Sequence, residues 1–243
     1  MSEPIPQFSQ IGVVQSCFAE KFGVPRQSLM VKQALGVLKF NPDPNFPMAF
    51  KDLEGFSHIW VTYVFHKNIE KGWTPTIIPP RLDGPQRVGV FASRSPHRPN
   101  PLGLSCLKIE KIDLKAKCGI EIHVSGLDIL DGTPILDIKP YLPYADSVPD
   151  AKCGWASGNI PKYPVSFSTQ SLDSIKKSSQ HPNLKELLTQ MLELDPRPTS
   201  QRKYVSIDDP SSKSRQYAFR LFDFDVQWQI VDQGIYVIDL VSL

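Results

Sequence analysis

The sequence is poor in the features that mark membrane proteins, zinc-binding domains and disulfide-rich domains. Only four of its 243 residues are cysteine, and no two of them form a Cys-x-x-Cys pair, which argues against a zinc site or a disulfide framework. No stretch approaches the roughly 20 apolar residues that a membrane helix needs. The first ten residues lack a basic start followed by an apolar core. We therefore expect no signal peptide, and a cytoplasmic protein with reduced thiols.

Several nucleotide-binding and hydrolase signatures are absent as well. The chain contains no G-x-G-x-x-G, no G-x-x-x-x-G-K-[ST], no G-x-S-x-G and no H-E-x-x-H, so a nucleotide-like cofactor would not be held in a Rossmann or P-loop manner. The net charge is only +2. This balance gives no general sign of nucleic-acid binding, although a local basic patch could still serve that purpose.

Proline, in contrast, is abundant: the 23 prolines are nearly twice the usual share of about 5%. They gather in short clusters, the densest of which lies in FASRSPHRPNPLGLS, residues 91–105. Each proline fixes its own φ and restricts the residue before it, so this stretch predicts a stiff loop. Arg94 and Arg98 on it offer paired donors suited to carboxylate or phosphate, and Gly103 permits close backbone approach. The alternative is a surface loop with solvated arginines.

Short β-branched and aromatic runs separated by glycine and proline predict a mainly β domain, a barrel or a sandwich, over residues 1–150. The strands are expected at 8–14, 59–65, 87–92, 104–112, 120–124 and 135–138. Residues 150–164 resemble a linker. A small α+β domain is then predicted over residues 151–243, with a boundary between about 150 and 165. Its expected elements are a strand at 165–168, a helix at 183–194 and a hairpin at 222–240.

Two further places suggest chemistry. In LDILDGTPILDIKPYLP, residues 127–143, Asp128 could accept hydrogen bonds from a ligand hydroxyl or amine; the alternative is a plain turn with exposed charges. No histidine or cysteine lies nearby, so we expect no metal. His66 ends a buried run and is a structural residue, a polar lip of a pocket, or a general base. Arg26 and Gln27 follow the first strand and could form a second cationic loop.

Taken together, these stretches resemble the TsaA/TrmO-like family of tRNA methyltransferases. The motif R-S-P-x-R-P-N-P-[IL]-G occupies residues 94–103, joined by Arg26-Gln27 and by residues 127–146. The resemblance is close over residues 8–146, and DPRP at 195–198 is similar to the longer bacterial members. Leu102 stands where isoleucine is usual.

The resemblance implies a single-sheeted β-barrel that binds S-adenosyl-L-methionine, works as a homodimer and needs no metal. It implies methylation of the 6-amino nitrogen of threonylcarbamoyl-adenosine beside the anticodon of threonine tRNA. The cofactor contacts that it implies are Arg26, Gln27, Ser28, His66, Lys67, Arg94, Leu104, Leu127, Asp128, Ile129 and Leu130. Arg98, Asn100 and Lys139 are expected to bind substrate. The general base, if one is needed, would be His66, Asp128 or the carboxylate of the substrate.

Three other possibilities stay open at this point. The basic residues at 197–220, which are Arg197, Arg202, Lys203, Lys213, Arg215 and Arg220, either extend the RNA surface by phosphate contacts or form a solvated loop. The rigid cationic loop would also suit a non-catalytic barrel that binds nucleotide or RNA. A phosphate-ester hydrolase is a third class, but the sequence shows no nucleophile or metal constellation for it.

Overall fold

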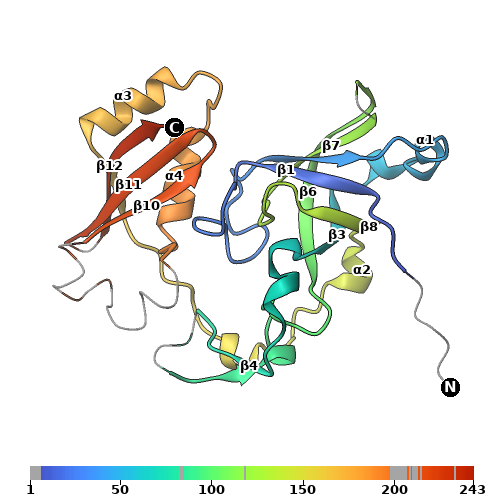
Figure 1. Cartoon of the computed structure of the whole chain (residues 1–243), viewed down its shortest axis with the longest axis horizontal. Coiled ribbons are helices and arrows are strands. Elements are labelled where there is room, and N and C mark those ends of the chain that lie inside the picture. Colours follow the sequence, from blue (N-terminus) through green and yellow to red (C-terminus); the bar gives the residue numbers. More distant parts are fainter. Residues whose placement is uncertain are drawn as a thin grey trace.

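The structure is a computed structural model that describes residues 7–80, 82, 85–117, 119–197, 207, 209, 213, 215–232 and 234–243. It contains a closed barrel, a four-stranded sheet with two helices beside it, and a two-stranded ribbon (Figure 1). The expected fold, a mainly β chain with a barrel followed by a small α+β part, is confirmed.

The barrel closes six antiparallel strands in the order β1-β2-β7-β6-β3-β8, and β8 pairs again with β1. Its strands are β1 Gly12–Ser16, β2 Gly36–Phe40, β3 His58–Val64, β6 Leu102–Ala116, β7 Gly119–Ser125 and β8 Pro134–Pro140. Alternate residues fill the interior: Ile59 and Val61 of β3 and Ile122 of β7 are fully buried. Closure pairs each barrel strand with a neighbour on both sides, so most of its backbone groups satisfy one another.

Short elements connect the barrel strands or follow the last of them. They are α1 Phe46–Ala49, η1 Leu53–Gly55, η2 His66–Lys71, β4 Thr76–Ile77, β5 Val88–Gly89, η3 Val90–Ala92, α2 Pro143–Asp146 and η4 Gly154–Ala156. Strands β4 and β5 pair with each other and form the ribbon. It leads into the proline loop, which we define as residues 93–101.

Some expected strands were wrong or missing. The run at 87–92 is a strand only over β5, because the Ser93 backbone N–H and Oγ both donate to the Val90 carbonyl and close a turn there. Strand β2 was not predicted, since Lys39 interrupts its short apolar run, yet it pairs with both β1 and β7. Strand β6 continues to Ala116 because β7 pairs along its extension.

The second sheet has the order β10-β11-β12-β9, in which only β9 runs parallel to its neighbour. Its elements are β9 Val165–Phe167, α3 Thr169–Lys177, α4 Leu184–Leu192, β10 Gln216–Leu221, β11 Phe224–Val231 and β12 Gly234–Ser242. The predicted helix is α4, and its apolar face is buried as expected. The sequence did not predict helix α3, because most of its residues are polar. Strand β10 was not predicted either. Among the described residues, no helix combines the length and the apolar character required to span a membrane.

The segment between β1 and β2, residues 17–35, joins the barrel to the second sheet. Its backbone and side chains bond to the C-terminal part at several points: Arg26 Nη2 donates to the Asp195 carbonyl at 2.8 Å, and Gln33 N–H donates to Gln190 Oε1 at 3.0 Å. Phe222 N–H donates to the Cys17 carbonyl at 3.1 Å. The two parts are therefore hydrogen-bonded through this joining segment.

The basic residues expected to extend an RNA surface lie in different settings. Arg197 is buried and its Nε lies 2.8 Å from Asp195 Oδ1, so it does not face solvent. Lys213 pairs with Asp232, while Arg215 and Arg220 are exposed. Arg202 and Lys203 lie outside the described residues. The described part of this segment thus offers two exposed arginines rather than a continuous basic face.

Candidate functional site

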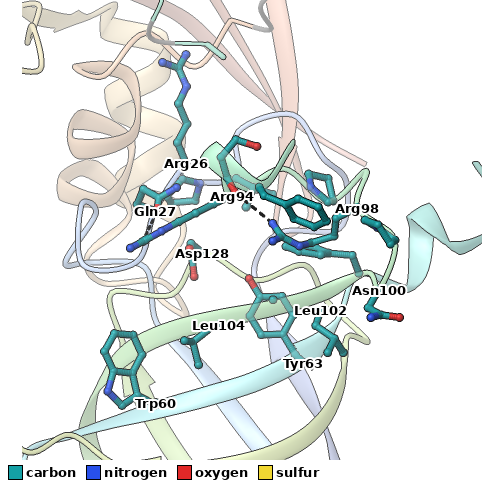
Figure 2. Close-up of a pocket in the computed structure, with 18 residues that line it drawn as sticks. Arg26, Gln27, Trp60, Tyr63, Arg94, Arg98, Asn100, Leu102, Leu104 and Asp128 are labelled. Carbon is teal, nitrogen blue, oxygen red and sulfur yellow. Dashed lines mark hydrogen bonds between the residues drawn. The ribbon is translucent and has the colours of Figure 1, made fainter. Parts of the chain in front are cut away.

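A cavity of about 700 Å³ lies between the barrel, the proline loop and the joining segment (Figure 2). We call it the main cavity, and its volume is in the range of small-molecule sites. Residues that line it include Arg26, Gln27, Trp60, Tyr63, Phe65, Phe91, Arg94, Arg98, Asn100, Leu102, Leu104 and Asp128. Aromatic and aliphatic side chains therefore share this cavity with two arginines from the proline loop and one carboxylate.

The proline loop is fixed by hydrogen bonds to its carbonyl groups and by serines within it. The Pro101 carbonyl accepts from Phe65 N–H at 2.7 Å, and the His97 carbonyl accepts from Thr74 N–H at 3.3 Å. Ser93 Oγ donates to the Val90 carbonyl at 2.8 Å and accepts from Ser95 N–H at 3.3 Å. Because prolines donate no hydrogen bond, the loop is attached to its surroundings through carbonyls and through the His97 ring, whose Nε2 lies 3.3 Å from Asn68 Nδ2.

The three predicted arginines do not share one role. Arg94 Nη1 donates to Gln27 Oε1 at 2.5 Å and so bridges the proline loop to the joining segment. Arg98 Nη1 donates to the Ser93 carbonyl at 3.2 Å. Among the described residues, neither Arg94 nor Arg98 has a carboxylate oxygen within 4.0 Å. The Arg26 side chain points away from Asp128 and toward the C-terminal part (Figure 2), where it bonds to backbone carbonyls.

Asp128 is the centre of a hydrogen-bond network. Ser105 Oγ donates to Asp128 Oδ1 at 2.6 Å, and the Tyr63 hydroxyl lies 3.3 Å from Ser105 Oγ. The backbone of Ser28 also donates to the carboxylate. Burial raises the pKa of Asp128 from 3.8 to about 6, against the opposing effects of Ser105 and the Arg94 charge. This carboxyl group therefore titrates close to neutral pH.

Gly103 makes room for the tyrosine of this network. Tyr63 on β3 pairs directly with Gly103 on β6, and a Cβ atom on residue 103 would lie 2.2 Å from Tyr63 Cζ. The close approach expected at this glycine is therefore made by the Tyr63 ring. Since Ser105 is two residues further along the strand, the ring lies over Gly103 and brings its hydroxyl to Ser105.

We expect Gly103→Ala to destabilise the protein by about 1–3 kcal/mol, the usual cost of overpacking a well-packed site. The added methyl group must displace the Tyr63 ring, which is buried. Urea unfolding measures the effect. Gly89→Ala is the matched control, because a Cβ atom at residue 89 meets nothing within 4 Å. Equal stability of the two variants would contradict this account of Gly103.

A second, smaller cavity of about 160 Å³, the lateral cavity, adjoins the main one. Its lining includes Lys21, His66, Lys67, Asn68, Ile129 and Leu130, and it shares Tyr63, Phe65 and Asp128 with the main cavity. Burial and the nearby Lys67 charge lower the pKa of His66, so its imidazole is neutral at pH 7. The two cavities meet at Asp128.

The structure thus gathers most of the predicted site residues around two adjoining cavities. Leu127 is fully buried in the core, and Ser28 contributes its backbone. Lys139 is exposed on β8, pairs with Asp137 and lines neither cavity. The sequence analysis missed Tyr63 and Ser105. Their signals were weak: a tyrosine in a buried run, and a serine two residues after a glycine.

A third cavity of about 450 Å³ lies on the other side of the Gln27–Arg94 bridge. Its lining is mostly apolar and comes from both parts of the chain, including Met30, Val31, Trp155, Met191 and Leu194. No group of three or more histidine, cysteine, aspartate or glutamate side chains within the described ranges could hold a metal ion.

Comparison with known proteins gives matches over nearly the whole chain. The family model of the tRNA-methyltransferase O N-terminal domain matches residues 13–147, and that of the TrmO C-terminal domain matches residues 160–243. A tRNA (adenine(37)-N6)-methyltransferase of Escherichia coli (strain K12) is 40% identical over 236 residues, which cover 96% of this chain and 97% of the relative.

Two further matches concern the cofactor and the fold. A protein of Pyrococcus abyssi named "Probable S-adenosyl-L-methionine-binding protein" is 37% identical over 155 residues, which cover 64% of this chain and 78% of the relative. A crystal structure of TrmO from Pseudomonas aeruginosa has a TM-score of 0.77 and 35% identity, with 98% of this chain and 99% of that chain covered.

Proposed function

Because this chain belongs to the tRNA-methyltransferase O family, we propose that it transfers a methyl group from S-adenosylmethionine to N6 of adenine 37 in tRNA, at the junction of the main and lateral cavities. The family resemblance predicted from the sequence is confirmed, as is an enzyme of the tRNA (adenine-N6)-methyltransferase class. One observation carries the proposal of the site: two cavities of different size meet at the half-buried carboxylate of Asp128.

The main cavity suits the cofactor in chemistry and size. S-adenosylmethionine, when bound, supplies a methyl group on a positively charged sulfur, which an in-line displacement transfers without a metal. The apolar walls at Trp60, Leu102 and Leu104 suit its adenine ring. Asp128 can accept a hydrogen bond from a hydroxyl or amine, and Arg94 can bind the methionine carboxylate. Among the predicted cofactor residues, His66, Lys67, Ile129 and Leu130 would act from the lateral cavity.

The protein contributes mainly by holding the two reactants in line and close together. We propose that the preferred acceptor is threonylcarbamoyl-adenosine of threonine tRNA, whose carboxylate would meet Arg98 and Asn100 at the rim of the main cavity. The accepting nitrogen is part of a urea, so its lone pair is delocalised and loss of its proton helps the reaction. Asp128 has a pKa of about 6, which suits a general base near neutral pH.

The pH dependence separates Asp128 from His66, the other candidate base that the protein itself provides. If Asp128 must be ionised, kcat/KM should rise with pH through about 6 and level off above about 7, with unit slope on the acid side. We expect His66→Gln to retain this rising limb, because glutamine does not titrate. Loss of the limb in that variant would assign the proton acceptor to His66.

The test of the function uses purified protein, radiolabelled S-adenosylmethionine and two tRNA pools, one from cells that make threonylcarbamoyl-adenosine and one from cells that cannot. Label in the first pool alone would support the full proposal. Label in both pools would support adenine methylation, and it would show that the threonylcarbamoyl group is not required. No label in either, with cofactor still bound, would favour a non-catalytic barrel that binds nucleotide or RNA.

Two further parts of the proposal concern assembly and location. The homodimer and the cytoplasmic location that the resemblance and the sequence imply stay predictions. Light scattering coupled to size-exclusion chromatography, with and without tRNA, measures the first. A molar mass equal to one chain under both conditions would contradict it.

A further inference from the structure

Lys21 and Lys67 line the lateral cavity, and Lys71 lies next to Lys21 beside it. Lys21 comes from the joining segment, whereas Lys67 and Lys71 belong to η2. Lys21 Nζ donates to Oδ1 of the buried Asn68 at 2.7 Å. Burial and then the neighbouring Lys71 charge lower the pKa of Lys21, and the Lys67 and Lys21 charges help to lower that of His66. The fold thus holds like charges near each other.

The carboxylates of Glu20 and Asp131 do not neutralise this group. Glu20 Oε1 accepts from Arg220 N–H at 3.0 Å, and Asp131 Oδ1 accepts from Ser16 N–H at 2.8 Å, so both face other partners. Within the part of the chain that the structure describes, no carboxylate oxygen, including those of Glu70, lies within 4.0 Å of the three lysine amines. Asp128 lines the same cavity but forms no ion pair with these lysines. Clustered positive charge without a carboxylate in ion-pair contact is unfavourable unless an anion binds there.

We propose that Lys21 and Lys71 bind a backbone phosphate of the tRNA beside the target nucleotide, an inference that rests on the proposed function. Phosphate contacts from lysine and asparagine position RNA without reading its sequence. The lateral cavity shares Asp128 with the main cavity, so an anion held at its lysines lies next to the reacting groups. The cofactor has one carboxylate, for which Arg94 is proposed above, and this leaves Lys21 and Lys71 for the RNA.

Lys71→Ala is the first variant, because it removes one charge and leaves the Lys21–Asn68 hydrogen bond in place. The probe is a fluorescent anticodon stem-loop of threonine tRNA, titrated at several salt concentrations. We expect about tenfold weaker RNA binding and a log–log salt slope that is shallower by about 0.7, the value for one phosphate of a single strand. The Kd for S-adenosylmethionine should stay within about twofold. Lys71→Arg should bind RNA as wild type does.

A structural role of Lys71 would give a different pattern. Since Lys71→Ala relieves repulsion, its melting temperature should be unchanged or higher, whereas a merely structural lysine would lower it. Lys21→Gln is the second variant. The substitution removes the charge, and the glutamine amide can still donate a hydrogen bond to Asn68. Lys111→Ala is the matched control: this lysine pairs with Asp113 on β6 and lines neither cavity.

Two outcomes overturn the proposal while the proposed function stands. One is wild-type RNA affinity and salt slope in both Lys71→Ala and Lys21→Gln, with wild-type protein active on tRNA. The other is a tenfold loss of S-adenosylmethionine affinity with RNA binding intact, which would assign the lysines to the cofactor carboxylate. Absence of methyl transfer and of tRNA binding in the wild-type protein would instead reject the proposed function itself, and this inference with it.

Discussion

Asp128→Asn is expected to lower kcat by about 10²–10⁴-fold, the range that a lost general base usually costs. Asparagine keeps the shape of the side chain and can accept the hydrogen bond from Ser105, but it cannot take a proton. Single-turnover methyl transfer with saturating cofactor and tRNA measures the loss. Asp113→Asn changes a partly exposed carboxylate on β6 that pairs with Lys111, and this matched control should keep wild-type activity. A kcat within threefold of wild type in Asp128→Asn would remove Asp128 as the base.

The same variant should be more stable than the wild-type protein at neutral pH. The folded pKa of Asp128, about 6, exceeds its ordinary value of 3.8, so the folded protein binds this proton more tightly than the unfolded chain does. Its contribution to stability is therefore present below pH 3.8 and is lost as the pH rises through about 6, a difference of about 3 kcal/mol. Asparagine does not ionise and avoids this loss.

Urea unfolding of wild type and Asp128→Asn at pH 4 and pH 8 tests that expectation. The variant should gain about 1–3 kcal/mol over wild type at pH 8 and almost nothing at pH 4. Loss of activity together with a gain of stability is typical of a group placed for function at some cost to the fold. A variant that is less stable than wild type at both pH values would show that Asp128 serves the fold.

Arg94→Ala is the second change with a large expected effect: it should weaken S-adenosylmethionine binding by about 10–100-fold. A hydrogen bond to a charged partner contributes about 1.5–3 kcal/mol, and Arg94 has no carboxylate of its own within 4.0 Å among the described residues. Calorimetric titration with S-adenosylmethionine measures the change. Arg94→Lys should fall between wild type and alanine, since lysine keeps the charge but loses the paired donors.

Gln27→Ala and Arg87→Ala serve as controls for Arg94. The first breaks the bridge to the joining segment and leaves the guanidinium in place, so its effect should be smaller. The second removes an exposed arginine that bonds to Thr76, and it should leave cofactor affinity unchanged. Full retention of affinity for both cofactor and tRNA in Arg94→Ala would show that Arg94 has no part in either site.

The sequence predicted those features that local chemistry determines. The proline loop could be recognised because each proline restricts its own and the preceding backbone, and α4 because five apolar residues recur on one face. Strand β2 could not be recognised in the same way: its run GVLKF is short and interrupted, and it is a strand because β1 and β7 pair with it from both sides.

In the candidate site, too, local patterns predicted individual residues but not the contacts between distant ones. Arg94, Arg98 and Asp128 stand in distinctive stretches and were predicted, whereas the Tyr63–Ser105–Asp128 network joins residues 42 and 23 positions apart in the sequence. Arg26 was expected to contact the cofactor; it lines the main cavity, and its guanidinium bonds to a carbonyl 169 positions away, which no local pattern indicated. Contacts across such separations arise from the barrel topology and from the packing of the second sheet, which local patterns do not encode.

The joining segment makes the two parts of the chain thermodynamically coupled. Through Arg26 and Gln33 it is held by the C-terminal part, and through Gln27 it is held by Arg94 at the main cavity. A ligand that fixes Arg94 therefore also favours the docked arrangement of the second sheet, and by reciprocity docking tightens the ligand by the same factor. Substitution of Arg26, which removes its bond to the Asp195 carbonyl, should thus weaken cofactor affinity by an amount that follows the stability it removes from this docking.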